Sequence, residues 1–313
     1  MTRIATAAEN ALTLYYMQLN QTAESNLQAQ ISTGDTAQTY SQIAPQTAQL
    51  EQFRTEASQQ QGFINTINTV STNMQAMSQS LNQILNQVQS FESTLANDAY
   101  NTAQPTIQAQ AQTLLTQVAG YLNTQGVTGY LFSGTNTTTP PVDLTALPQG
   151  AAATLTTAVG GPPSSGGYYA GGANIPPVKI DTQVSVNYGV TADNPVFEQI
   201  IRVLNFVGQN GPFSSTNPVD QANVTQAGQM LANATQSLTG IAGNLALQQA
   251  QMNTAKTVHQ STLNIAQNGI SNIVNVNQAT AISQLQSLET QIQASYTATS
   301  QISKLSLVNF MSG

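Results

Sequence analysis

The sequence contains no cysteine and no tryptophan, and only 6% of its 313 residues are charged. Without cysteine the chain can form neither a disulfide framework nor a thiolate nucleophile. Its 6 Lys and Arg residues and its net charge of −7 exclude the basic stripe that nucleic-acid binding requires. The surface must therefore consist largely of Gln, Asn, Ser and Thr, a composition that favours an elongated, polar, exported protein.

Long apolar runs are also missing. No segment approaches the roughly 18 consecutive apolar residues of a membrane-spanning helix. Near the N-terminus, Glu9 and Asn10 interrupt any apolar core of a signal peptide. We therefore expect no membrane insertion, and export by a route that reads an uncleaved N-terminus.

Histidine occurs once, as His259, in a polar helical segment beside Lys256 and Val258. A zinc protease helix needs two histidines four residues apart with a glutamate between them. We therefore predict an ordinary surface or interface role for His259. The glycines from Gly161 to Gly172 indicate a low-complexity linker rather than a phosphate loop. The acidic residues are too scattered to suggest a catalytic carboxylate pair, so we predict no enzyme, no metal site and no cofactor.

Each end of the chain has an apolar stripe with the three- and four-residue steps of a helix. In residues 1–33 the stripe consists of Ile4, Ala8, Leu12, Tyr15, Leu19, Ala23, Leu27 and Ile31. In residues 270–311 it consists of Leu285, Leu288, Ile292, Ser295, Thr299, Ile302 and Leu305. Both segments are nearly free of proline and are predicted to be amphipathic helices.

Neither terminal helix has enough apolar residues to be stable alone. Burying one Leu or Ile side chain gains about 1.5–3 kcal/mol, whereas ordering each residue costs about 1–2 kcal/mol. A lone helix of this kind frays, but packing against other copies stabilises it by mass action. We predict that both ends are unstructured on a solitary molecule and pack between subunits through Ile4, Leu12, Tyr15, Leu19, Leu27, Leu285, Leu288, Ile292, Ile302, Leu305 and Leu307.

The segment between Pro45 and Pro105 contains no proline and has a regular apolar seam from Leu50 to Leu95. The seam predicts a helix of roughly 50 residues, about 75–80 Å long, whose apolar side chains form an intramolecular core. A third helix is expected to begin near Pro105, a residue favoured in the first turn, and to end after Leu122.

The composition changes between Ser133 and Pro195, where Gly, Pro, Thr and Ala dominate. Alternating apolar residues predict short strands and turns there, at Val178, Ile180, Val184 and Val186. Helical spacing resumes with Phe197, Ile200, Ile201, Leu204 and Val207. No proline follows Pro218, and a bend or change of register is expected at Gly240, Gly243 or Gly269.

These patterns predict a mainly α protein, an elongated antiparallel helical bundle or coiled coil with a small β-rich insertion. The expected parts are a terminal assembly domain of residues 1–44 with 262–313, a rod of residues 45–132 with 195–261, and an outer domain of residues 133–194. Because helices precede and follow the insertion, the two chain ends should lie together.

Several sequence elements resemble the flagellin superfamily, and more closely its hook-associated protein 3 branch, which joins the hook to the filament. They are Gln30 to Gly34, Gly129 to Thr135 with the following Pro140-Pro141-Val142, Ile180 to Phe197, Ile292 to Tyr296, and Lys304 to Phe310. Gly129 to Thr135 favours the junction branch over filament flagellin. The chain departs from the family at Asp35, where a basic residue is usual, and at Asn272, Asn275 and Asn277, where acidic residues are usual.

The resemblance implies a structural protein that is exported unfolded through the flagellar type III channel with the help of a chaperone. It implies an extracellular helical assembly of identical copies, in contact with flagellin and a neighbouring hook-associated protein. Filament flagellin is the alternative.

Two other classes of protein share some of these features. A signalling coiled coil normally has membrane spans or a receptor module and more Glu and Lys. A surface adhesin would use the insertion to bind carbohydrate, with Tyr168, Tyr169 and Tyr188 stacking on sugars, but we expect these tyrosines to serve in packing.

Overall fold

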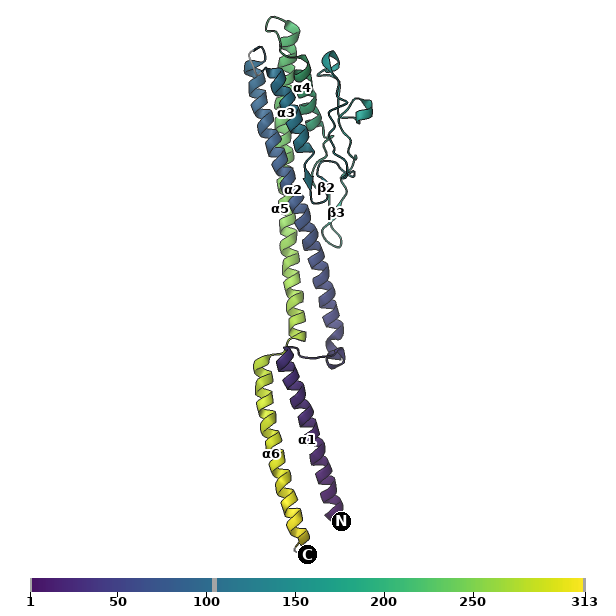
Figure 1. Ribbon diagram of the computed structural model, residues 1–313, viewed down its shortest axis with the longest axis vertical. Helices are drawn as coiled ribbons and strands as arrows, with labels where there is room; N and C mark the ends of the chain where they lie inside the picture. The colour runs from purple at the N-terminus through teal and green to yellow at the C-terminus, as the bar shows by residue number, and fades with distance from the viewer. Residues whose placement is uncertain (1, 103–105, 312–313) are drawn as a thin grey trace. The chain divides into compact units, whose positions relative to one another are not determined.

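The computed structural model describes residues 2–102 and 106–311, and within these ranges it leaves the side chains of residues 2–10, 302, 303 and 305–311 undescribed. The chain divides into two compact units. The terminal unit comprises Met1–Gln60 and Ser261–Gly313, and the central unit comprises Gln61–Gln260. Long α-helices dominate both units, with two small two-stranded sheets, which confirms the predicted mainly α class with a β-rich insertion (Figure 1).

The terminal unit is built around α1 (Thr2–Thr33) and α6 (Gln278–Met311), which lie side by side and antiparallel (Figure 1). The start of α1 and the end of α6 therefore lie together, as the sequence predicted. Gly34 ends α1 with a φ of +80°, a conformation that glycine adopts without steric strain. A short 3-10 helix, Tyr40–Gln46, leads into α2 (Thr47–Asp98).

Two main-chain hydrogen bonds tie the segments that follow α1 and precede α6. The Thr36 N–H donates to the carbonyl of Val274 at 2.6 Å, and the Val276 N–H donates to the carbonyl of Gly34 at 2.8 Å. The Gln30 side-chain amide also donates to the carbonyl of Thr36 at 2.7 Å. These bonds join the segment that follows α1 to the segment that precedes α6.

The central unit contains α3 (Ile107–Leu122), α4 (Pro195–Asn210) and parts of α2 and α5 (Pro218–Val274). The seam predicted for α2 is intramolecular, since its large apolar side chains are buried against the other helices of the same chain: Ile64, Ile67, Met74, Leu81, Val88, Phe91 and Leu95. The predicted stripe of α4 is fully buried as well, at Phe197, Ile200, Ile201, Leu204 and Val207. Pro105 lies outside the described residues, and Thr106 caps α3 by accepting a hydrogen bond from the Ala109 N–H.

The insertion consists mainly of turns and one short antiparallel hairpin, and a second hairpin lies just before it. β1 (Gln125–Gly126) pairs with β2 (Gly129–Tyr130), and β3 (Val178–Lys179) pairs with β4 (Ser185–Val186), which places Val178 opposite Val186. Phe132 packs edge-on against Phe197 of α4, with ring centroids 6.1 Å apart. The prediction of short strands and turns is therefore confirmed.

Two expectations were wrong. α5 runs unbroken through Gly240, Gly243 and Gly269, and helical structure ends only at Val274. A glycine costs only about 1 kcal/mol in a helix interior, which packing readily offsets. His259 is not a surface residue: its side chain is buried, with Nε2 2.8 Å from the carbonyl oxygen of Ile180 and its ring 5.1 Å from that of Phe63.

Candidate assembly surface on the terminal helices

The predicted stripe of α6 faces α1 of the same chain. Ile292 is buried, and Leu285, Leu288, Ser295 and Thr299 are half-buried, at the spacing expected from the sequence. The contact with α1 includes polar groups: the amide of Gln21 donates to the hydroxyl of Tyr296 at 2.7 Å, and the hydroxyl of Thr299, which donates to the carbonyl of Ser295 at 2.8 Å, lies 3.8 Å from Sδ of Met17. Within one molecule, α1 thus covers part of the surface that we predicted to contact other subunits.

The predicted stripe of α1 divides into two parts. Ala23, Leu27 and Ile31 are half-buried, whereas Leu12, Tyr15 and Leu19 remain exposed, with exposed fractions of 54%, 55% and 46%. The cause is geometric. Each four-residue step exceeds one helical turn of 3.6 residues by about 40°, so a stripe built from such steps winds around the helix. The face toward α6 is completed instead by residues such as Thr13, Met17 and Asn20, which are half-buried.

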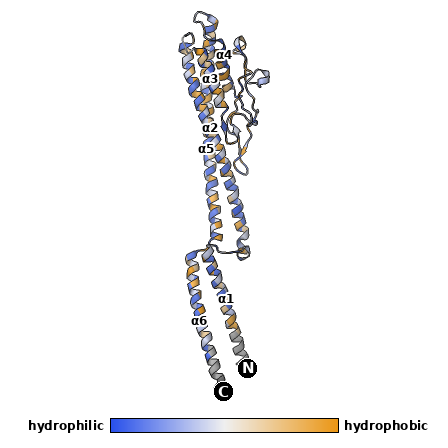
Figure 2. Ribbon diagram, viewed as in Figure 1, coloured by the Kyte–Doolittle hydropathy of each residue, from blue (hydrophilic) through white to orange (hydrophobic). Residues whose placement is uncertain are grey.

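The side chains of Leu12, Tyr15, Tyr16 and Leu19 form what we call the outer apolar patch. Tyr16, which the stripe did not include, is 56% exposed, and its ring lies 5.8 Å from that of Tyr15 in an edge-on arrangement. Isolated exposed apolar residues are common on proteins, but a cluster of large ones marks an interaction surface. Figure 2 shows apolar residues interspersed with polar ones along both terminal helices.

Four of the predicted contact residues cannot be placed. Ile4, Ile302, Leu305 and Leu307 lie outside the part of the chain whose side chains the structure describes. For all eleven residues, the assignment to contacts between subunits stays a prediction.

Among the side chains that the structure describes, no ion pair joins α1 to α6. Wherever side chains are described, ion pairs occur only within single helices, between Glu51 and Arg54 and between Glu198 and Arg202. The hydrogen bond described between α1 and α6 joins two uncharged groups, the amide of Gln21 and the hydroxyl of Tyr296. Salt therefore screens little of the described part of this contact.

The described residues include no group of three or more His, Cys, Asp or Glu side chains that could hold a metal ion. Over the same residues, no helix combines the length and the apolar character needed to cross a bilayer.

Comparison with known proteins gives one family match. Residues 229–311, which span most of α5 and all of α6, match the family model of the bacterial flagellin C-terminal helical region. No curated protein matches the sequence. The C-terminal part of the chain is thus similar to the corresponding region of bacterial flagellins.

Solved structures give a second line of comparison. The structure of a putative flagellar hook-associated protein from Vibrio parahaemolyticus is 14% identical, covers 75% of this chain and 100% of its own, and has a TM-score of 0.58. FlgL from Bacillus cereus is also 14% identical, covers 66% of this chain and 98% of its own, and has a TM-score of 0.48. The similarity to the Vibrio parahaemolyticus protein shows a shared fold.

Proposed function

We propose that this chain is a structural protein of the bacterial flagellum that joins the hook to the filament by self-assembly of its terminal helices. The observation that carries the proposal is the outer apolar patch of α1, which lies on the helix paired with the flagellin-like α6. A terminal helix pair with large exposed apolar side chains needs a further partner, and copies of the same chain supply one.

The energetics of the terminal unit support assembly-dependent order. Among the described side chains of α1 and α6, Ala281 and Ile292 are the apolar residues that are buried. The central unit, in contrast, has a continuous core in which α4 alone buries Phe197, Ile200, Ile201, Leu204 and Val207. An isolated α1–α6 pair therefore gains little to offset the ordering of its backbone. Neighbouring subunits would cover the outer apolar patch and provide the missing stabilisation.

The partners follow from this role. The chain would form a helical assembly with its own copies, and would contact flagellin on one side and another hook-associated protein on the other. Terminal segments that order only on assembly suit export as an unfolded chain through the flagellar type III channel, with a chaperone protecting them beforehand. The proposed location is the extracellular flagellum, and the role is mechanical, with no catalysis, cofactor, nucleic acid or membrane insertion.

Filament flagellin is the second candidate. It is favoured by the family match itself, which is to the C-terminal helical region of flagellin. The junction role is favoured by the sequence element from Gly129 to Thr135, which resembles the hook-associated branch. Both roles use the same terminal helices, so the distinction must come from where the protein acts in the flagellum.

Electron microscopy of cells that lack this protein separates the two roles. Hooks without filaments, with flagellin shed into the medium, are expected for a junction protein. Loss of the filament subunit itself, with no flagellin in the medium, would instead identify the chain as filament flagellin. Flagella of normal structure and length would contradict both roles, and restoration by the expressed chain is the control.

A further inference from the structure

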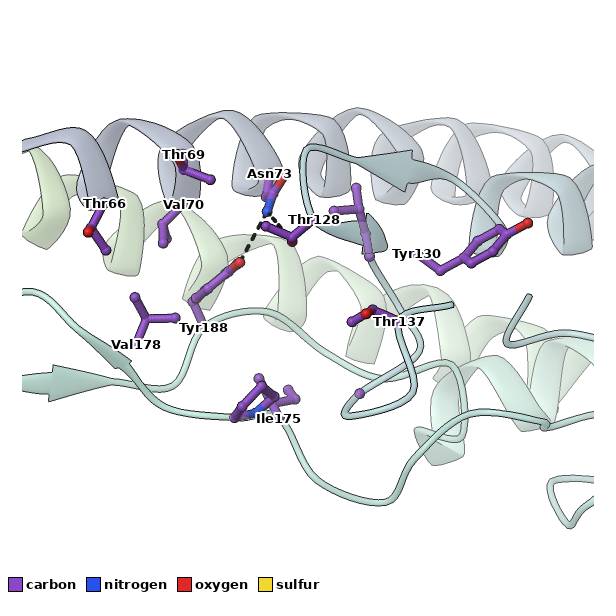
Figure 3. Close-up of a pocket in the computed structure, with 13 residues that line it drawn as sticks. Thr66, Thr69, Val70, Asn73, Thr128, Tyr130, Thr137, Ile175, Val178 and Tyr188 are labelled. Carbon is purple, nitrogen blue, oxygen red and sulfur yellow. Dashed lines mark hydrogen bonds between the residues drawn. The ribbon is translucent and has the colours of Figure 1, made fainter. Parts of the chain in front are cut away.

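The central unit contains a cavity of about 430 Å³ that the assembly role does not use. It lies between α2, the β1–β2 hairpin with the loop after it, and the segment from Ile175 to Tyr188 (Figure 3). Sites for small molecules typically have volumes of roughly 300–1,000 Å³ and join apolar walls to a few fixed polar groups. The cavity has this size, and the character of its walls indicates what it could bind.

The lining of the cavity is uncharged. None of its thirteen residues is Asp, Glu, Lys, Arg or His. A charged ligand would lose its hydration there without gaining an ionic partner, which is strongly unfavourable. The lining therefore selects a neutral ligand.

The polar groups of the cavity are held in place by Asn73. This side chain is only 1% exposed, and its amide nitrogen donates to the hydroxyls of Thr128 at 3.2 Å and Tyr188 at 3.3 Å (Figure 3). Its oxygen accepts a hydrogen bond from the Val127 N–H at 2.9 Å. Because Asn73 is the donor in both contacts, the hydroxyl protons of Thr128 and Tyr188 remain able to donate to a ligand.

The cavity also offers acceptors. The hydroxyls of Thr66 and Thr69 donate to the carbonyls of Gly62 at 3.0 Å and Asn65 at 3.2 Å within α2. Their protons are therefore used, and their oxygens can accept hydrogen bonds from a ligand. The site thus presents donors and acceptors at separate positions, which suits a ligand with several hydroxyl groups.

Apolar walls complete the site. Val70 of α2 lies on one side, and Ile175 and Val178 lie on the other (Figure 3). Such walls fit the C–H face of a sugar ring, while the hydroxyls at the ring edge meet Tyr188, Thr128, Thr66 and Thr69. A purely apolar ligand would leave these polar groups without hydrogen bonds, at a loss of free energy.

We propose that this cavity binds a neutral saccharide of one or two rings, with Tyr188 and Thr128 as donors and Thr66 and Thr69 as acceptors. All of the lining residues belong to the central unit. The inference is independent of the proposed assembly of the terminal helices, and each can fail without the other.

Saturation-transfer NMR on the full chain tests the site with maltose, cellobiose and diacetylchitobiose as neutral probes, glucuronic acid as an anionic probe and toluene as an apolar probe. We expect transfer to at least one neutral disaccharide and none to glucuronic acid at pH 7. Tyr188→Phe, which keeps the ring and removes the hydroxyl, should weaken that binding by about fivefold or more. Ile175→Trp should fill the cavity and abolish binding.

Tyr100→Phe is the matched control, because Tyr100 is 38% exposed and does not line the cavity. It should leave saccharide affinity unchanged, and circular dichroism should show all three variants to be as helical as the parent chain. Absence of binding by every neutral disaccharide would overturn the proposal. Binding of toluene alone, equal binding of glucuronic acid, or saccharide binding that Tyr188→Phe leaves intact would overturn it as well.

Discussion

The outer apolar patch gives a quantitative prediction for assembly. Leu12 and Leu19 are 54% and 46% exposed, so about half of each side chain remains to be covered by a neighbour. Full burial of a leucine is worth about 1.5–3 kcal/mol, which leaves about 1 kcal/mol for each residue. Replacing both with glutamine should therefore weaken the contact by about 2 kcal/mol, or about thirtyfold in affinity.

The assay is the binding of the purified chain to hooks isolated from cells that lack it, followed by cosedimentation. The concentration for half-maximal binding should rise about thirtyfold for the Leu12→Gln, Leu19→Gln double variant. The thermal unfolding of the central unit should not change, because Leu12 and Leu19 belong to the terminal unit.

Leu14→Gln is the control. Leu14 is 57% exposed, and a two-residue offset from Leu12 places it about 200° around the helix, on another face. Its substitution should leave binding to hooks nearly unchanged. Parental affinity in the double variant, or an equal loss in Leu14→Gln, would refute the assignment of the patch.

Four further results are expected. Burial raises the pKa of Tyr169 to about 12 and raises that of Tyr168 further, from an ordinary value of 10.0. The stability that comes from burying the neutral phenols should be complete below pH 10 and be lost as the pH rises through 12. The urea concentration at the midpoint of unfolding should therefore be lower at pH 11.5 than at pH 9, and equal midpoints would contradict this expectation. Gly134 has a φ of +63°, and an added Cβ would lie 2.2 Å from the carbonyl oxygen of Gly172. Gly134→Ala should lower the free energy of unfolding by more than about 1 kcal/mol, whereas Gly62→Ala, where a Cβ meets nothing within 4 Å, should raise it by about 0.5–1 kcal/mol in the same urea titration. Amide exchange of the dilute chain should be fast in α1 and α6 and slow in α4, and equal protection would argue against ordering on assembly. Because only 6% of the residues are charged, few contacts between subunits can depend on carboxylates, so assemblies should persist at pH 4; their complete dissociation by light scattering would oppose this view.

Much of the helical architecture could be predicted from spacing and proline placement. The apolar seam after Pro45 correctly predicted α2. The stripe from Leu285 to Thr299 matches the face of α6 that packs on α1. These predictions hold because helices are fixed by contacts between residues three or four apart in the sequence. Only part of the α1 stripe, Ala23, Leu27 and Ile31, is covered within the molecule, because its four-residue steps wind around the helix; its role between subunits stays a prediction.

The cavity beside Asn73 and Tyr188 could not be predicted from the sequence. Asn73 reaches Thr128 and Tyr188, which are separated from it by 55 and 115 residues, and no local pattern signals such contacts. The burial of His259 was missed for the same reason, since its hydrogen-bonding partner Ile180 lies 79 residues away. The expectation that Tyr168 and Tyr169 serve in packing is confirmed, since both are buried, whereas Tyr188 lines the cavity.

The paired hydrogen bonds between Gly34 and Val276 and between Thr36 and Val274 use peptide groups alone. Main-chain hydrogen bonds of this kind do not depend on the chemical identity of most nearby side chains. Mutations can therefore alter the outer faces of both terminal helices while this joint between them persists. Gly34 is the exception, because its positive φ excludes most replacements. A force applied to either end of the chain would therefore pass along its helix to this joint, where the two main-chain hydrogen bonds connect the segments beside α1 and α6.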